Sequence, residues 1–169
     1  MSIEDDLLRL AREREEGVER ALAELLLEQP DHLRRQLRVY LSRQVDHGRM
    51  KRADERIPQL ATVGKGLNEL ACPRAEFSSG AQLMFRIKLE KVQRGWLMRC
   101  FEFHLRLPQP RRIGMVSIHL NDEASYKPLL VPRCHIHIGD SEAHVPFPVM
   151  DPRLILHLIC ERVEPDFGV

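Results

Sequence analysis

Residues 83–107, with the sequence LMFRIKLEKVQRGWLMRCFEFHLRL, decide the fold class. On either side of a turn at Gln93-Arg94-Gly95, apolar and polar side chains alternate with a period of two, which is typical of β-strands with one buried face. The two alternating runs therefore predict a β-hairpin. Alternation returns in 113–120 and 134–138, so we expect a four- to five-stranded antiparallel sheet.

Helical spacing dominates the first 70 residues. Apolar side chains recur every three or four positions from Ile3 to Leu26 and again from Leu33 to Val45, which predicts two amphipathic helices. Gln29-Pro30-Asp31 separates them, and so short a turn predicts a hairpin of two antiparallel helices. A short third helix is expected between Met50 and Leu70.

The C-terminal part is predicted to close with a helix. Asp151 can cap its first amides and Pro152 suits its first turn. The sequence thus predicts an α+β fold: an N-terminal helical hairpin, the antiparallel sheet and a C-terminal helix. We assign residues 1–70 to a helical hairpin or extension and residues 81–169 to the sheet with its C-terminal helix.

Composition and spacing exclude several classes of protein. The 169 residues include four cysteines, but none are spaced closely enough for a metal knuckle or a redox pair. The acidic N-terminus is unlike a secretory signal, and no apolar run is long enough to span a bilayer. We therefore expect a reduced cytoplasmic protein with no membrane association and no cofactor.

The alternation also predicts a surface. If the apolar side chains of the strands face the core, four of the eight histidines lie on the opposite face of the sheet. Histidine titrates near neutrality and serves as a general acid or base, while arginine can stabilise a phosphorane-like charge, as in metal-free ribonucleases. The candidate catalytic residues are His135, His137, His104, His119, Arg106 and Glu102.

Two other interpretations of this face stay open. His135 and His137, two residues apart on one strand, could hold a divalent metal together with a third histidine from a neighbouring strand. The face could equally be a solvated sheet surface without chemistry. We assign no residue as a metal ligand from the sequence.

Charge is divided into blocks along the chain. Residues 1–31 carry a net charge of −6, residues 32–112 carry +11 and residues 113–169 carry −4. The basic block could bind nucleic acid or an acidic partner, or it could pair with the acids of the first helix, in the same chain or across a dimer. The candidate binding residues are Arg34, Arg35, Arg38, Arg43, Arg49, Lys51 and Arg52.

The run from Trp96 to Val163 resembles a family of small bacterial proteins. The histidine doublet and glycine of His135-Ile136-His137-Ile138-Gly139-Asp140, followed by a closing helix, are similar to those of proteins that include TumE, the toxin component of toxin–antitoxin pairs. The resemblance covers about 40% of the chain. It departs at the longer loop before His135 and in the first 70 residues, which have no counterpart. It implies a toxin directed at RNA or the ribosome, or a relative that has lost that activity.

The leading interpretation is a small bacterial cytosolic accessory protein of a toxin–antitoxin or defence system. It would bind a protein partner, or form a homodimer, through its N-terminal helices. The alternatives are an RNA-directed, nuclease-like toxin that uses the histidine-rich face, and a metal-binding protein. The sequence leaves open whether the protein is an enzyme.

Overall fold

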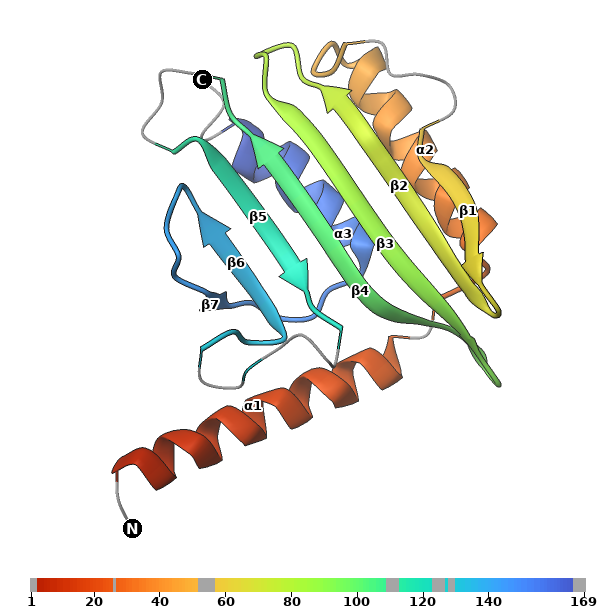
Figure 1. Ribbon diagram of the computed structural model, residues 1–169. Coiled ribbons are helices and arrows are strands. Elements are labelled where there is room, and N and C mark those ends of the chain that lie inside the picture. Colours follow the sequence, from red (N-terminus) through yellow and green to blue (C-terminus); the bar gives the residue numbers. More distant parts are fainter. Residues whose placement is uncertain are drawn as a thin grey trace.

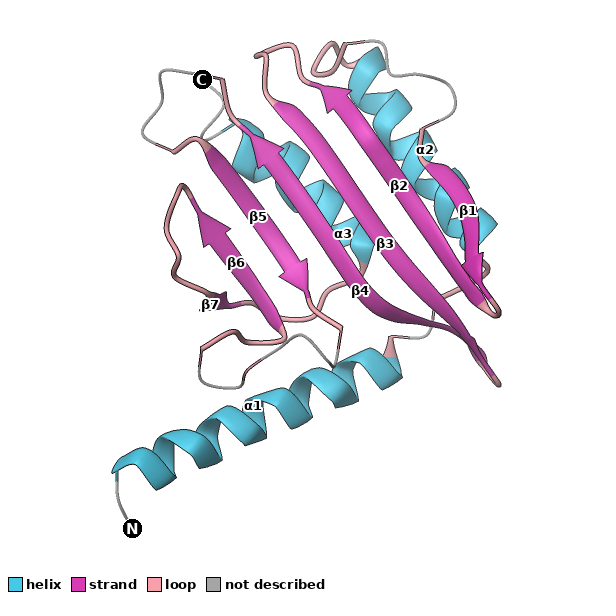
Figure 2. Cartoon of the chain, in the orientation of Figure 1, coloured by secondary structure: helices cyan, strands magenta, loops and turns pink. Residues whose placement is uncertain are grey.

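The protein has an α+β fold, and its described residues form one seven-stranded antiparallel sheet and three α-helices (Figures 1 and 2). The computed structural model describes residues 3–25, 27–51, 57–108, 113–122, 127 and 130–165. The elements are α1 (Ile3–Glu24), α2 (Pro30–Asp46), β1 (Gln59–Gly64), β2 (Leu67–Glu76), β3 (Gln82–Val92), β4 (Gly95–Arg106), β5 (Met115–Leu120), β6 (Cys134–Ile138), β7 (Val145–Pro146) and α3 (Pro152–Leu158), which a π-helical turn (Ile159–Val163) continues.

The sheet is a simple meander in which the strands lie side by side in sequence order. The predicted hairpin is confirmed as β3 and β4, with Phe85 opposite Phe103 and their rings stacked at 5.1 Å. Each later strand pairs with its predecessor. Connections this short keep neighbours in sequence adjacent in the sheet.

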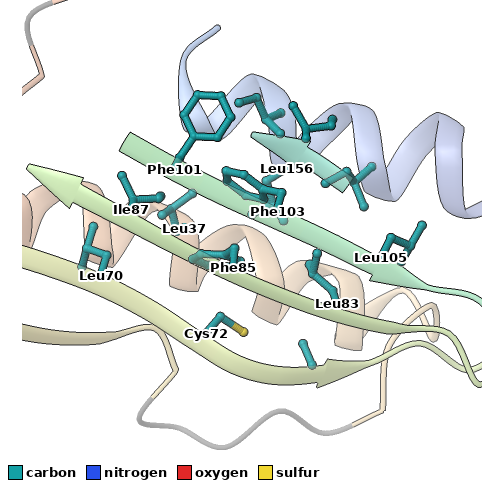
Figure 3. Packing of buried hydrophobic residues seen from close by; sticks show 14 of the residues in the cluster. Leu37, Leu70, Cys72, Leu83, Phe85, Ile87, Phe101, Phe103, Leu105 and Leu156 are labelled. Carbon is teal, nitrogen blue, oxygen red and sulfur yellow. The ribbon is translucent and has the colours of Figure 1, made fainter. Parts of the chain in front are cut away.

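One face of the sheet is packed against α2 and α3 (Figure 1). The apolar members of the alternating strands point to these helices, and in Figure 3 Phe103 and Leu105 lie on the same side of the sheet as Leu156 of α3. Leu37 of α2 belongs to the same buried cluster. The predicted C-terminal helix is therefore confirmed as α3, and the Asp151 side chain caps it by accepting a hydrogen bond from the Arg153 amide at 2.8 Å.

Helix α1 lies across one end of the sheet rather than on its face (Figure 1). Its anchor is Arg133, whose side chain is 2% exposed and forms an ion pair with Glu19. The backbone amide of Arg133 donates to Glu15 of the same helix at 3.3 Å. Leu22 adds apolar contact, because it is buried in the main hydrophobic cluster.

Three details of the predicted fold are wrong. The first two helices do not form a hairpin, since the apolar side of α2 (Leu33, Leu37 and Leu41) is buried in the main hydrophobic cluster while α1 lies at the sheet end. The sheet has seven strands instead of four or five. The short helix expected between Met50 and Leu70 is absent from the described residues there, 50–51 and 57–70, which instead include β1 and the start of β2.

The overlooked strands have weak sequence signals. β1 is largely exposed, so it lacks a clear apolar alternation. Pro73 interrupts β2, but it falls where the pairing with β3 shifts register between Cys72 and Ala75. A proline is tolerated at such a bulge because a ladder hydrogen bond is already missing there. β7 has only two residues.

Within the described part of the chain, no helix combines the length and apolar character needed to cross a lipid bilayer.

The packing of α2 makes a first testable prediction. Leu37 is fully buried, so Leu37→Ala should lower the free energy of unfolding by about 2–5 kcal/mol through lost burial and a new cavity. Ser42→Ala, on the exposed side of the same helix, should change it by less than about 0.5 kcal/mol. Urea denaturation measures both, and equal effects would show that α2 does not pack on the sheet in solution.

Candidate functional site on the open face of the sheet

The face of the sheet opposite α2 and α3 carries a cluster of imidazoles. We call this side the open face, because within the described residues no helix covers it (Figure 1). Antiparallel pairing sets His119 of β5 directly opposite His135 of β6, and His104 of β4 opposite Ser117. Directly opposed side chains in such a sheet are about 5 Å apart.

The four histidines predicted to share this face do converge. The ring centroid of His119 lies 5.0 Å from that of His104, 5.3 Å from that of His135 and 5.2 Å from that of His137. The rings of His135 and His137 are 4.8 Å apart. His119 therefore stands at the centre of the group.

A fifth histidine, which sequence reasoning missed, completes the cluster. His144 has its ring 4.3 Å from that of His137 and 4.8 Å from that of His135. β7 pairs with β6 so that Val145 is opposite Ile136, and continuing that register sets residue 144 opposite His137. In the sequence, Gly139 was the available signal for a turn that brings the chain back beside β6. In the structure its φ is 69°, a conformation that favours glycine. We refer to His104, His119, His135, His137 and His144 as the histidine cluster.

Three of these side chains are close enough to share one ion. A ligating atom of His119, one of His135 and one of His137 all lie within 4.8 Å of one another. A tetrahedral zinc ion with Zn–N bonds of about 2.0–2.1 Å needs nitrogens about 3.3 Å apart. Small rotations of the imidazoles can close that difference.

The hydrogen bonds orient the rings as metal ligands are usually oriented. Nδ1 of His135 donates to the carbonyl oxygen of Pro132 at 2.6 Å, which leaves the lone pair of its Nε2 free. Such a bond from the far ring nitrogen is the common support of a metal-binding histidine. Nε2 of His119 is buried and has no hydrogen-bond partner among the described residues, and such an orphan nitrogen is expected where an ion or water binds.

Burial favours the neutral form of four of the clustered rings, those of His104, His119, His135 and His137. Desolvation, assisted by the neighbouring histidines, lowers the pKa of His119 to about 3. Desolvation is also the main cause that lowers the pKa values of His104, His135 and His137. Only the neutral imidazole has a lone pair to offer to a metal.

The other two predicted catalytic residues lie on β4 beside the cluster. Glu102 is opposite His119, and its carboxylate is 4.0 Å from Nε2 of His104. Arg106 is exposed and opposite Met115 at the end of β5. His104 itself makes a hydrogen bond of 2.9 Å to the hydroxyl of Ser117. The site therefore holds both basic and acidic side chains within one patch of the sheet.

The predicted basic binding residues are dispersed and several are paired. Arg34 and Arg35 form ion pairs with Asp31 of their own helix, and Arg49 pairs with Glu161 after α3. Lys51 pairs with Glu76 of β2. Arg38 and Arg43 are exposed on α2, and Arg52 lies outside the described residues. Since α2 covers the other face of the sheet, its residues Arg34, Arg35, Arg38 and Arg43 are remote from the histidine cluster.

Two of the acids of α1 have partners outside α2. Glu13 pairs with Arg9 of its own helix and Glu19 pairs with Arg133. Neutralisation of the basic block across a dimer stays a prediction.

Comparison of the chain with protein-family models, with curated proteins and with solved structures finds no match in any of the three. The resemblance to TumE-like proteins and the toxin–antitoxin setting therefore stay predictions. The class that the fold and site define is an α+β protein with a histidine cluster on the open face of an antiparallel meander.

The buried imidazoles make stability depend on pH. Because folding lowers their pKa values, the unfolded chain binds more protons than the folded chain below about pH 6.5. Their stabilising contribution is complete above that pH and is lost as the pH falls toward the folded value, about 3 for His119. The melting temperature of chelator-treated protein should therefore fall by several degrees between pH 7 and pH 5, at about 2–4 °C per kcal/mol.

The variant His119→Gln, which cannot titrate, should reduce this fall, whereas His47→Gln, at an exposed residue after α2, should leave it unchanged. Thermal melts followed by circular dichroism at each pH make the comparison. A His119→Gln melting curve with the wild-type pH dependence would contradict the assignment of buried neutral rings.

Proposed function

We propose that this protein binds a divalent transition-metal ion, most simply Zn²⁺, through His119, His135 and His137. The observation that carries the proposal is the approach of three ligating atoms to within 4.8 Å on two paired strands. His144 stands next to two of the three rings. Imidazole nitrogens are ligands that zinc, copper, nickel and iron accept in proteins.

The surroundings support a reactive centre over a purely structural one. Three histidine ligands leave the fourth position of a tetrahedral ion for a substrate, as catalytic zinc sites do. The strands already form a continuous hydrophobic core on their other side, so the fold has no need of a metal. His104 and Glu102 lie beside the cluster and can accept or return a proton.

Metal binding can be measured directly. Protein purified without a histidine tag and freed of metal should bind one Zn²⁺ or Co²⁺ per chain by calorimetry. At a free metal concentration of 100 times the dissociation constant, binding should stabilise the fold by about 2.7 kcal/mol. His135→Ala/His137→Ala should abolish binding because it removes two of three ligands.

His47→Ala is the matched control, since this histidine is exposed and far along the chain from the cluster. Wild-type protein that takes up no metal, or a double variant that binds as well as wild type, would reject the site.

RNA is the substrate that we propose for this centre. The supporting observation is that Arg86 and Lys88 of β3 share the open face with Arg106. Arg86 is exposed and opposite Glu102, so it lies next to the strand that carries His104. Phosphodiesters are attracted by such side chains, and a zinc ion supplies Lewis acidity for their hydrolysis.

The RNA proposal has its own test. Metal-loaded protein should cleave a single-stranded RNA, and His104→Asn should reduce kcat by about 10²–10⁴-fold, the range for loss of a general base, while retaining the metal. Arg86→Ala/Arg106→Ala should raise KM with little change in kcat. Arg38→Ala, on the opposite side of the sheet, serves as the control. Intact RNA after incubation with metal-loaded wild type would reject RNA as substrate without affecting the metal site.

A further inference from the structure

Helix α1 is divided into an anchored half and a projecting half. Its C-terminal half is fixed to the sheet end through Glu15, Glu19 and Leu22. In its N-terminal half, Ile3 is 82% exposed, and Leu7 and Leu10 are each 52% exposed. These three residues are spaced at i, i+4 and i+7, so they lie on the same side of the helix and form one apolar stripe. A stripe of this kind is typical of a helix that packs against a partner.

A groove that could receive this apolar stripe lies on the outer side of α2. It has a volume of about 810 Å³, and Val39 within it is 51% exposed. The lining residues recur at helical spacing along α2, and α3 contributes Arg153. Most of the lining comes from Asp31, His32, Arg35, Gln36, Val39, Tyr40 and Arg43.

The charges of the helix and the groove are complementary. α1 contains eight acidic and four basic residues, for a net charge of −4, and α2 contains four basic and two acidic residues, for a net charge of +2. Arg35, Arg43 and Arg153 line the groove together with one acid, Asp31. Arg35 also pairs with Asp31, and Arg153 with Asp151, within the chain. Opposite potentials of this kind align partners and suppress wrong ones.

The dimensions of the two elements also agree. From His32 to Arg43 the groove follows twelve residues of α2, about 16 Å of helix, and the stripe from Ile3 to Leu10 needs about 10 Å. The stripe can therefore lie in the groove with room for its flanking acidic side chains.

The helix of the same chain does not reach this groove. Its anchored half holds α1 along the end of the sheet, and in Figure 1 the N-terminal end points away from α2. Among the residues that the structure describes, nothing covers the apolar stripe of α1 and nothing occupies the groove on α2.

We propose that the N-terminal half of α1 of one copy docks in the α2–α3 groove of a second copy, and that the exchange is reciprocal. Ile3, Leu7 and Leu10 pack over Val39, while the acidic side chains of α1 meet Arg35, Arg43 and Arg153. Two identical contacts close a dimer with two-fold symmetry, which satisfies both surfaces of both copies. This inference does not depend on the proposed metal site.

Sedimentation velocity of the full chain tests the proposal. Wild type should have twice the mass of one chain, and Leu7→Glu and Val39→Glu should each raise the dimer dissociation constant at least tenfold. Both residues are exposed, so the melting of a diluted monomer should be unchanged. Arg43→Glu should weaken the dimer, and adding Asp5→Lys should restore part of the loss by reversing both charges.

Val63→Glu is the matched control, because Val63 is 51% exposed on the edge strand β1, where two sheets could pair instead. Dissociation by Val63→Glu but not by Leu7→Glu would overturn the proposal in favour of edge pairing. A wild type that is monomeric even at about millimolar concentration would overturn it as well, because a specific dimer should be populated there.

Cross-linking locates the contact between copies. A Leu7→Cys chain mixed with a Val39→Cys chain should form a disulfide-linked heterodimer under mild oxidation. Native cysteines interfere little, since Cys72, Cys134 and Cys160 are buried and Cys100 is half-buried. A Val63→Cys chain is the control. If Leu7→Cys does not link to Val39→Cys, or links to Val63→Cys equally well, the helix does not occupy the groove.

Discussion

Burial of one face of the sheet against α2 and α3 is the constraint on which the remaining structure depends. Side chains on a strand alternate with a period of two, so a register slip of one residue would exchange the two faces of that strand. The phenylalanines of β3 and β4 and the aliphatic residues of β5 all require the helix-covered side. Their burial therefore fixes His104 and His119 on the other side without any interaction among the histidines themselves. Burial of Cys134 in the same core does so for His135 on β6.

This constraint explains what could be predicted from the sequence. Residues 83–107 alternate so clearly that the hairpin, the α+β class and the shared face of four histidines follow from the pattern. The alternation in 134–138 likewise places His135 and His137 together. To predict that the rings converge, one would also need the order of the strands. In the meander β4, β5 and β6 are successive neighbours, and this order brings the rings together.

The parts that could not be predicted lack a periodic signal. β1 is an exposed edge strand, and β2 contains Pro73 at a bulge, so the sequence pattern predicts neither of them as a strand. His144 belongs to a two-residue strand that exists through its pairing with β6. The helical hairpin was expected because α1 and α2 are both amphipathic, but amphipathicity specifies that a face is buried and not what covers it. The sheet was the larger apolar surface available to α2.

Electrostatics link the site to the anchor of α1. Arg133 immediately precedes Cys134 and follows Pro132, whose carbonyl orients the ring of His135. The same arginine is buried and its guanidinium donates to the carbonyl oxygen of Asn121 at 3.2 Å, which ties the ends of β5 and β6 together. A buried charge is retained only if it is paired, so the acids of α1 also secure the backbone from which His135 projects. The C-terminal half of α1 is thereby committed to the sheet.

That commitment decides what its N-terminal half can do. A helix fixed at one end cannot fold back to bury its own exposed stripe, since a continuous α-helix has no hinge without a break in its hydrogen bonds. Ile3, Leu7 and Leu10 are held away from the core of their own chain by the interaction that stabilises the site end of the sheet. Weakening the Arg133–Glu19 pair would release α1 and disturb His135 together, whereas a change within the stripe would affect association alone. The proposed dimer would thus use the N-terminal half of α1, while the C-terminal half supports the strand that carries His135 through Arg133.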